Sequence, residues 1–217
     1  MKKRKLAGLA IGIFMFGASA TTSTHASLVS TFDTGSEGWS IEGSAENFTW
    51  MDSGGNPFGH IRADDIPMPT PNWYFISPDN WDGDWRQYIG GTLSYDFNLI
   101  YKDGDFAEVN YINLVRISSF TDEISYNFSS HIEFPVGIWQ TFEIQLSAVS
   151  FGVDAVTFSN IMSNVTSLKI IGEYTSGPDT GGLDNVNVNP IPIPGTLWLL
   201  GPCLAGLVGV RIRKRRN

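Results

Sequence analysis

The stretch that most constrains the fold is 93–101, in which apolar and polar residues alternate. Successive side chains of a β-strand point to opposite faces, so this pattern predicts a long strand with one face in a hydrophobic core. The apolar members of the pattern are Leu93, Tyr95, Phe97, Leu99 and Tyr101.

Further short apolar runs, separated by Gly, Pro, Asn and Asp, continue this pattern from about residue 28 to residue 188. Ten or so short strands with turn residues between them predict an all-β domain, a β-sandwich of the jelly-roll type. The first strand is expected at 28–32 and the last at 183–188, with one short helix at 154–162.

Residues 1–26 have the features of a secretory signal peptide. A basic start is followed by an apolar stretch at 6–18 and by small-residue cleavage sites after Ala20 and after Ala26. We favour cleavage after Ala26, because the first strand begins shortly afterwards, and cleavage after Ala20 stays open. The chain is therefore expected to be exported through the inner membrane.

Residues 190–217 form a three-part tail. Alternating prolines predict an extended spacer, because proline fixes its own φ and disfavours a helix. An apolar segment at about 195–210 follows; as a single helix it would reach about 24 Å, slightly less than the ~30 Å hydrocarbon core of a bilayer. Five basic residues at 211–216 would stay on the cytoplasmic side. A plain membrane anchor is the alternative interpretation.

The domain between these ends, residues 27–189, is strongly acidic. Nine of the 14 basic residues lie in the two terminal segments, so five remain against all 22 acidic ones, a formal charge of −17. Nucleic acid is excluded as a partner, because its binding depends on Lys and Arg contacts to phosphates. The only cysteine, Cys203, lies in the tail, so the domain has no disulfide.

A loop at 81–85 places two tryptophans around two carboxylates. Aromatic rings can stack on the C–H faces of sugars while carboxylates accept hydrogen bonds from hydroxyls, so Trp81, Asp82, Asp84 and Trp85 form a candidate glycan site. The alternative is that the rings close one end of the sandwich. Trp73 and Phe75, in a predicted strand, are expected in the core.

Asp33 near the start of the domain and Asp184 near its end are a candidate calcium site. They come close together if the first and last strands pair, and Ca²⁺ is bound by six to eight oxygens. The alternative is that Asp184 caps a turn by accepting backbone N–H groups.

Several other carboxylate pairs, at 64–65, 103–105 and 122–123, fit a weak glycoside hydrolase only if two of them face each other across a cleft. With only His60 and His131 in the domain, neither a Ser-His-Asp nor a zinc-like spacing is present. We therefore expect a protein that is not an enzyme.

The tail resembles the PEP-CTERM sorting signals of Gram-negative bacteria, which a membrane transpeptidase called exosortase processes. The resemblance rests on the Pro-x-Pro entry, on Trp-Leu-Leu-Gly at 198–201 and on the basic end. It implies a sorting motif at Pro192, Ile193 and Pro194, with Ile193 in place of the family's Glu. It also implies that the protein reaches the cell surface or the medium after tail removal.

The domain resembles the laminin B (laminin IV) family over about residues 32–188. The resemblance rests on Gly-Gly-x-Leu-Ser-Tyr at 90–95 and on Gly-Leu-Asp-Asn-Val at 182–186. It implies a jelly-roll sandwich related to galactose-binding and carbohydrate-binding modules, and a non-catalytic role. We therefore expect a surface or matrix protein associated with exopolysaccharide or biofilm. A carbohydrate-binding module with a defined glycan and a weak hydrolase are the alternatives.

Overall fold

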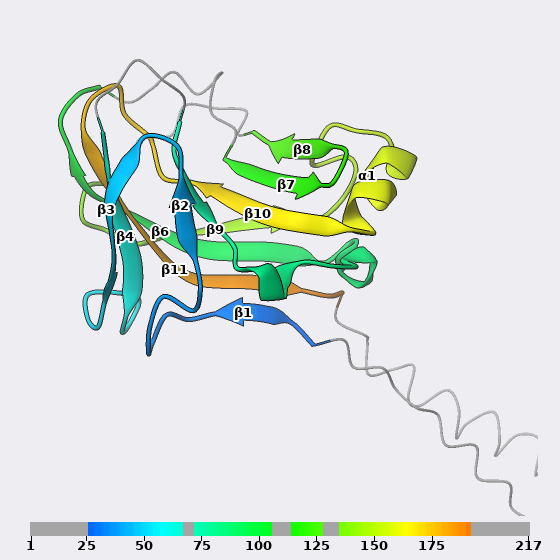
Figure 1. The fold of residues 1–217 in the computed structure, drawn as a ribbon, viewed down its shortest axis with the longest axis horizontal. Coiled ribbons are helices and arrows are strands. Elements are labelled where there is room, and N and C mark those ends of the chain that lie inside the picture. The colour runs from blue at the N-terminus through cyan, green and yellow to red at the C-terminus, as the bar shows by residue number, and fades with distance from the viewer. Residues whose placement is uncertain (1–25, 67–71, 106–113, 128–134, 192–217) are drawn as a thin grey trace, which may run out of the picture.

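The computed structural model describes residues 26–66, 72–105, 114–127 and 135–191, and these form a sandwich of two antiparallel sheets (Figure 1). The all-β expectation is confirmed. The signal peptide up to residue 25 and the tail from residue 192 lie outside the described residues. None of the helices in the described residues is long and apolar enough to cross a membrane.

Sheet A has six strands and sheet B has five. Sheet A follows the order β3-β4-β11-β6-β9, and β1 pairs with β11 beyond the end of β4; sheet B follows the order β2-β5-β10-β7-β8. The strands of sheet A are β1 (Leu28–Ser30), β3 (Ala45–Met51), β4 (His60–Asp65), β6 (Thr92–Lys102), β9 (Gln140–Gln145) and β11 (Asp179–Asn189). Those of sheet B are β2 (Ser40–Glu42), β5 (Tyr74–Ile76), β7 (Val115–Ser119), β8 (Glu123–Tyr126) and β10 (Val165–Ile171).

The core lies between the sheets and is built from the alternating residues of their strands. In β6 the residues Leu93, Tyr95, Phe97 and Leu99 are fully buried, as their alternation predicts. Trp73 and Phe75 are also fully buried, with ring centroids 5.0 Å apart, so their predicted place in the core is confirmed. Burying such large rings is a major source of stability for a sandwich without disulfides.

A single α-helix, α1 (Ala155–Met162), closes one end of the sandwich, where the sequence places it (Figure 1). Asp154 caps its first turn, because its carboxylate accepts hydrogen bonds from the backbone N–H groups of Val156 and Thr157. Two short 3₁₀ helices, η1 (Asp79–Trp81) and η2 (Arg86–Tyr88), lie between β5 and β6.

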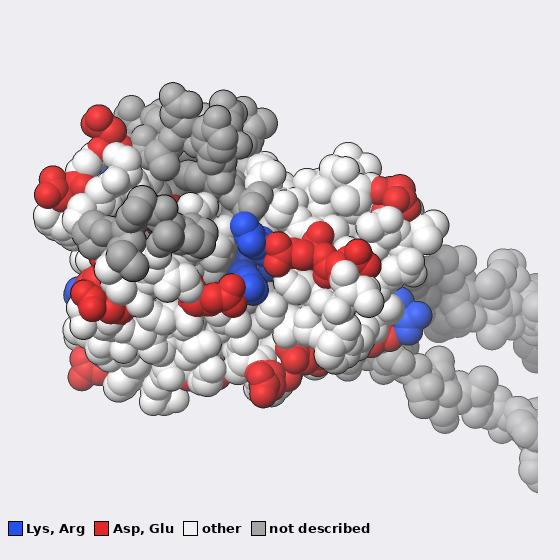
Figure 2. Space-filling view, turned by 45° about the horizontal axis from the view of Figure 1, so that its top comes forward, with Lys and Arg blue, Asp and Glu red and all other residues white. Residues whose placement is uncertain are grey.

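Acidic side chains are spread over the visible surface and basic ones are few (Figure 2). Among the described residues, Arg62 forms an ion pair with Asp64, Arg86 with Asp84, Arg116 with Glu123 and Lys169 with Glu42.

The first and last strands pair, as the calcium hypothesis requires. Leu28 of β1 is opposite Val188 of β11, and the two strands run antiparallel. The start of β1 and the end of β11 consequently lie side by side, so the described chain enters and leaves the sandwich at one end (Figure 1).

Candidate functional site

The outer face of sheet A, turned away from sheet B, is formed by the polar members of its alternating strands. In β6 these are Asp96 and Asn98, between the core residues already named. The register places Asp184 of β11 opposite Asp96, and Gly182 opposite Asn98. On the other side of β11, Arg62 of β4 is opposite Gly182. Gly182 is thus a position without a side chain in the middle of a polar sheet face.

Trp139, which precedes β9, lies across this bare position. A Cβ atom at Gly182 would lie 3.0 Å from Ile100 Cδ1, 3.2 Å from Trp139 Cη2 and 3.4 Å from His60 Cδ2. The rings of His60 and Trp139 meet edge to face, with centroids 5.3 Å apart. We call these four residues, Trp139, His60, Ile100 and Gly182, the Trp139 face. The indole is half-buried, so part of it is accessible to solvent.

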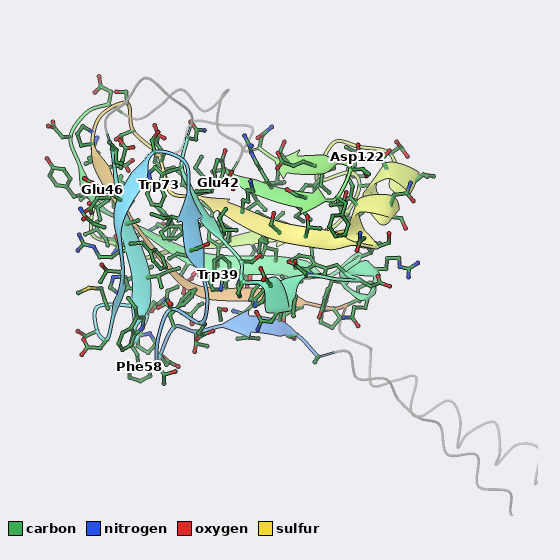
Figure 3. All side chains as sticks on the ribbon, in the orientation of Figure 1. Trp39, Glu42, Glu46, Phe58, Trp73 and Asp122 are labelled. Carbon is green, nitrogen blue, oxygen red and sulfur yellow. The ribbon has the colours of Figure 1, made fainter. Side chains whose placement is uncertain are left out.

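The indole is held by a hydrogen bond as well as by packing. Trp139 Nε1 donates to the carbonyl oxygen of Gly54 at 2.9 Å. Gly54 belongs to the loop between β3 and β4, residues 52–59, whose tip carries the exposed Phe58 (Figure 3). A loop distant in sequence therefore fixes one edge of the ring.

Asp96, 5% exposed, lies on the same outer face and accepts hydrogen bonds from three separate elements. Thr141 of β9 donates to its Oδ1 at 2.6 Å. Asn56 of the β3–β4 loop and Asn185 of β11 donate their side-chain amides to its Oδ2 at 3.0 and 2.8 Å. A buried carboxylate is tolerated when its oxygens are bonded in this way, so Asp96 joins β6, β9, β11 and the loop.

Asp184, 1% exposed, is bonded mainly to the backbone. Its carboxylate accepts the N–H of Asn56 at 2.6 Å and the N–H of Asn185 at 2.7 Å. Burial raises the pKa of Asp184 to about 6 despite these bonds, and the charges of Asp96 and Asp33 add to the rise.

The geometry at Asp184 matches the turn-capping alternative. Asp33 is exposed and accepts a hydrogen bond from Thr31 Oγ1, and both Asp184 oxygens are used by backbone amides. In the described segments, no group of three or more His, Cys, Asp or Glu side chains is arranged to hold a metal ion. Calcium binding by Asp33 and Asp184 stays a prediction.

The opposite flank of the Trp139 face carries a second polar group. Asp64 accepts hydrogen bonds from Thr180, Asn47 and Arg62 at 2.8, 3.0 and 3.2 Å. These three bonds lower the pKa of Asp64, although burial acts in the other direction. Burial and the charge of Arg62 lower the pKa of His60, so the imidazole beside Trp139 is neutral at neutral pH.

The sequence hypothesis for the loop at 81–85 required exposed indoles, and the structure corrects it. Trp81 and Trp85 are only 4% and 2% exposed. Trp81 packs edge to face on Trp39, and the loop is held inward by Gly83, which pairs with Val165. Neither ring can stack on a sugar, so the interpretation that they close the sandwich is confirmed.

Asp82 and Asp84, the two carboxylates of that loop, are exposed. Asp84 forms an ion pair with Arg86, and the hydrogen bonds from Arg86 hold the pKa of Asp84 at about 2. Burial, and secondarily the charge of Asp79, raise the pKa of Asp82.

The sorting motif Pro192, Ile193 and Pro194 lies outside the described residues.

Sequence reasoning gave Trp139 no role. A signal was present: outward-facing Thr141, Glu143 and Gln145 alternate with buried Phe142 and Ile144. Trp139 falls in the polar half of that alternation. A tryptophan on the polar side of a half-buried strand indicates a ring kept near the surface.

Comparison with known proteins shows the fold. No model of a protein family and no curated protein sequence matches the chain. An exo-β-agarase structure has a TM-score of 0.51 and 12% identity; the match covers 75% of this chain and 24% of the agarase, so the chain spans about a quarter of that enzyme.

Two smaller solved proteins are similar to a lesser degree. The family 11 carbohydrate-binding module of the Clostridium thermocellum cellulase Lic26A-Cel5E has a TM-score of 0.49 and 14% identity, covering 76% of this chain and 95% of the module. The L4b domain of human laminin alpha-2 has a TM-score of 0.48 and 13% identity, covering 59% and 79%. The sandwich expected from the laminin B resemblance is the fold observed.

Proposed function

We propose that the domain is a non-catalytic carbohydrate-binding module that binds its glycan on the Trp139 face. The observation that carries the proposal is the half-buried indole of Trp139, fixed by Gly54 and Gly182 on the polar outer face of a sheet. A rigid aromatic ring at a polar surface offers contact area with little loss of conformational entropy on binding.

The chemistry of the flanks suits sugar hydroxyls. The accessible part of the indole would stack on the C–H face of a pyranose ring, while polar groups on the same sheet face exchange hydrogen bonds with its hydroxyls. Arg62 has five N–H groups, one of which bonds Asp64, so it can still donate, and the exposed hydroxyl oxygen of Thr141, whose hydrogen is donated to Asp96, can accept. Such convergent polar groups beside an apolar surface are typical of small-ligand sites.

The charges of the face favour a neutral glycan. Arg62 is the cation placed there by the register, and it is already paired with Asp64. Asp96 and Asp184 are buried carboxylates on the same face. An anionic polymer would be repelled unless divalent cations bridged it to the protein.

In this proposal the chain is exported by its signal peptide, residues 1–26, and retained by its tail until an exosortase removes it at Pro192, Ile193 and Pro194. Support comes from the three-part tail sequence and from the shared end at which the described chain enters and leaves. A module held at that end leaves the sheet faces free for exopolysaccharide.

Calcium binding by Asp33 and Asp184 is a separate proposal. If it is right, excess chelator lowers the melting temperature of the protein.

The test is a glycan array followed by titration of the best neutral glycan with the wild-type protein and two variants. Trp139→Ala should abolish binding. Phe120→Ala is the matched control, because Phe120 is an exposed aromatic residue, 81% accessible, next to β7 in sheet B. Binding that survives Trp139→Ala, or is lost equally in Phe120→Ala, would contradict the proposal.

A further inference from the structure

The β3–β4 loop, residues 52–59, connects neighbouring strands but reaches far across sheet A. Its Asn56 contacts Asp184 of β11 and Asp96 of β6, and its Gly54 accepts the indole N–H of Trp139 next to β9. In the strand order β3-β4-β11-β6-β9 the loop therefore extends from β4 to the far edge. A connection between adjacent strands needs no such contacts, so they call for a separate explanation.

Asn56 anchors the loop through three of its polar groups. Its backbone N–H donates to Asp184 at 2.6 Å, its side-chain amide donates to Asp96 at 3.0 Å, and its carbonyl accepts from Asn185 Nδ2 at 2.5 Å. Asn56 is itself exposed, whereas both carboxylates are buried. Hydrogen bonds to charged, buried acceptors are stronger than average, so this residue fixes the loop on the sheet.

The anchored loop fixes one edge of the Trp139 ring. Gly54 lies two residues before Asn56, and its carbonyl oxygen receives the indole N–H at 2.9 Å. The other end of the indole, at Cη2, lies against Gly182. The ring is thus restrained at both ends, in contrast to a surface tryptophan that rotates freely, and restraint before binding reduces the entropy lost on binding.

From this geometry we infer that Asn56 is a positioning residue for Trp139. It holds the Gly54 carbonyl in place and so sets the orientation of the indole. The consequence for glycan affinity rests on the proposed function, whereas the restraint of the ring does not.

The direct test is the exchange of the Trp139 indole N–H with solvent, followed by NMR in the mature protein. Asn56→Ala removes the side-chain bond to Asp96 and leaves the two backbone bonds of this residue, so the acceptor at Gly54 is held less tightly and exchange at Trp139 should accelerate about tenfold. Ser53→Ala is the control: the Ser53 hydroxyl donates to Asp52 within the loop at 2.9 Å, so its removal leaves the contacts of Asn56 intact and exchange at Trp139 should match wild type.

A second variant keeps the test decisive if Asn56→Ala folds poorly. Asn185→Gly removes the side chain that bonds Asn56 and Asp96 from the β11 side, and glycine suits the positive φ of 49° at this position. It should also accelerate exchange at Trp139. Unchanged exchange in both variants overturns the inference.

Glycan titration separates the inference from the proposed function. Asn56→Ala should weaken affinity about tenfold and lower the melting temperature, because buried Asp96 loses one of its three hydrogen bonds, whereas Ser53→Ala should change neither. If the wild type binds no glycan but exchange accelerates as expected, the proposed function fails and the positioning role of Asn56 stands. If the variant binds glycan as tightly as wild type with unchanged exchange, the positioning role is refuted and the proposed function stands.

Discussion

Trp85 donates its indole N–H to the carbonyl oxygen of Trp81 at 2.7 Å, and both side chains are buried. The bond joins the end of η1 to the residue before η2, so the segment between β5 and β6 folds onto its own rings. Trp85 also packs edge to face on Tyr88, with centroids 6.0 Å apart. These aromatic contacts make the segment part of the core.

Replacing either Trp81 or Trp85 by Ala should therefore destabilise the domain. Removing a buried aromatic side chain from a core costs about 3–5 kcal/mol. Denaturant unfolding of the two variants measures this loss, with Asp82→Ala as a control at an exposed position of the same segment. If either variant keeps its full stability but loses glycan binding, these rings belong to the binding site and not to the core.

Gly182→Ala should displace Trp139 and weaken glycan binding about tenfold. The added methyl group would lie 3.0–3.4 Å from Ile100, Trp139 and His60, and small-to-large changes in packed sites cost about 1–3 kcal/mol. The near-ultraviolet circular dichroism of the protein and a glycan titration measure the two effects.

Gly35→Ala is the matched control for this substitution, because an added Cβ there meets nothing within 4 Å. It should leave both measurements at their wild-type values. An unaltered spectrum and affinity in Gly182→Ala would mean that the ring adapts and is not held by this glycine.

Stability should fall as pH rises through the acidic range towards 7. Burial, with the charges of Asp65 and Asp179, raises the pKa of Glu173 from 4.5 to about 7. Burial, with the charge of Asp65, raises the pKa of Asp179 from 3.8 to about 7. At a pH between the unfolded-state pKa and the folded-state pKa of these carboxyls, the folded state holds protons that the unfolded state has released. The free energy of unfolding therefore falls as pH rises through this range, and it levels off above pH 7.

Glu173→Gln should flatten this dependence, because the amide does not titrate. Melting temperatures of wild type and variant between pH 4 and pH 8 provide the measurement, and the variant should lose less stability across that range. Identical slopes for the two proteins would show that Glu173 does not titrate near neutrality.

Asp154→Ala should destabilise α1 and the end of the sandwich that it closes. Asp154 accepts two backbone N–H groups and the hydroxyl of Thr157, and loss of such an N-cap costs about 0.5–2 kcal/mol. Asp154→Asn keeps one acceptor oxygen and should recover most of the loss in thermal unfolding. Equal stability of Asp154→Ala and wild type would show that the cap is not needed.

Replacing Pro192 and Pro194 by Ala should leave export intact and prevent tail removal. The substitutions abolish the extended spacer that alternating prolines impose. Mass spectrometry of protein from cells with an exosortase measures the C-terminus. Wild-type protein that retains residues 197–217 in such cells would refute a sorting role for the tail.

The fold was predictable because its determinants are local and repetitive. The alternation from Leu93 to Leu99 marks β6, and the capping residue Asp154 precedes a short apolar stretch that forms α1. Each of these features can be recognised within a few neighbouring residues. The pairing of β1 with β11 is not local, and it entered the sequence analysis only as the condition of the calcium hypothesis.

The site was harder to predict because it depends on register and loop contacts. Asp82, Gly83 and Asp84 make their segment look solvent-exposed, yet the pairing of Gly83 with Val165 draws the neighbouring rings inward. Trp139 gains its importance from Gly182 and Gly54, which are 43 and 85 residues away along the chain. No local pattern contains either relationship.

The central place of β11 in sheet A has a mechanical consequence. Its first half is bonded to β4, its second half to β1, and its other edge to β6, and the chain continues from its end towards the tail. In the proposed arrangement, with the tail as the tether and a polymer bound to the domain, the force acts along β11. Its ladder of hydrogen bonds is then loaded in shear, and the bonds must yield together instead of opening one at a time.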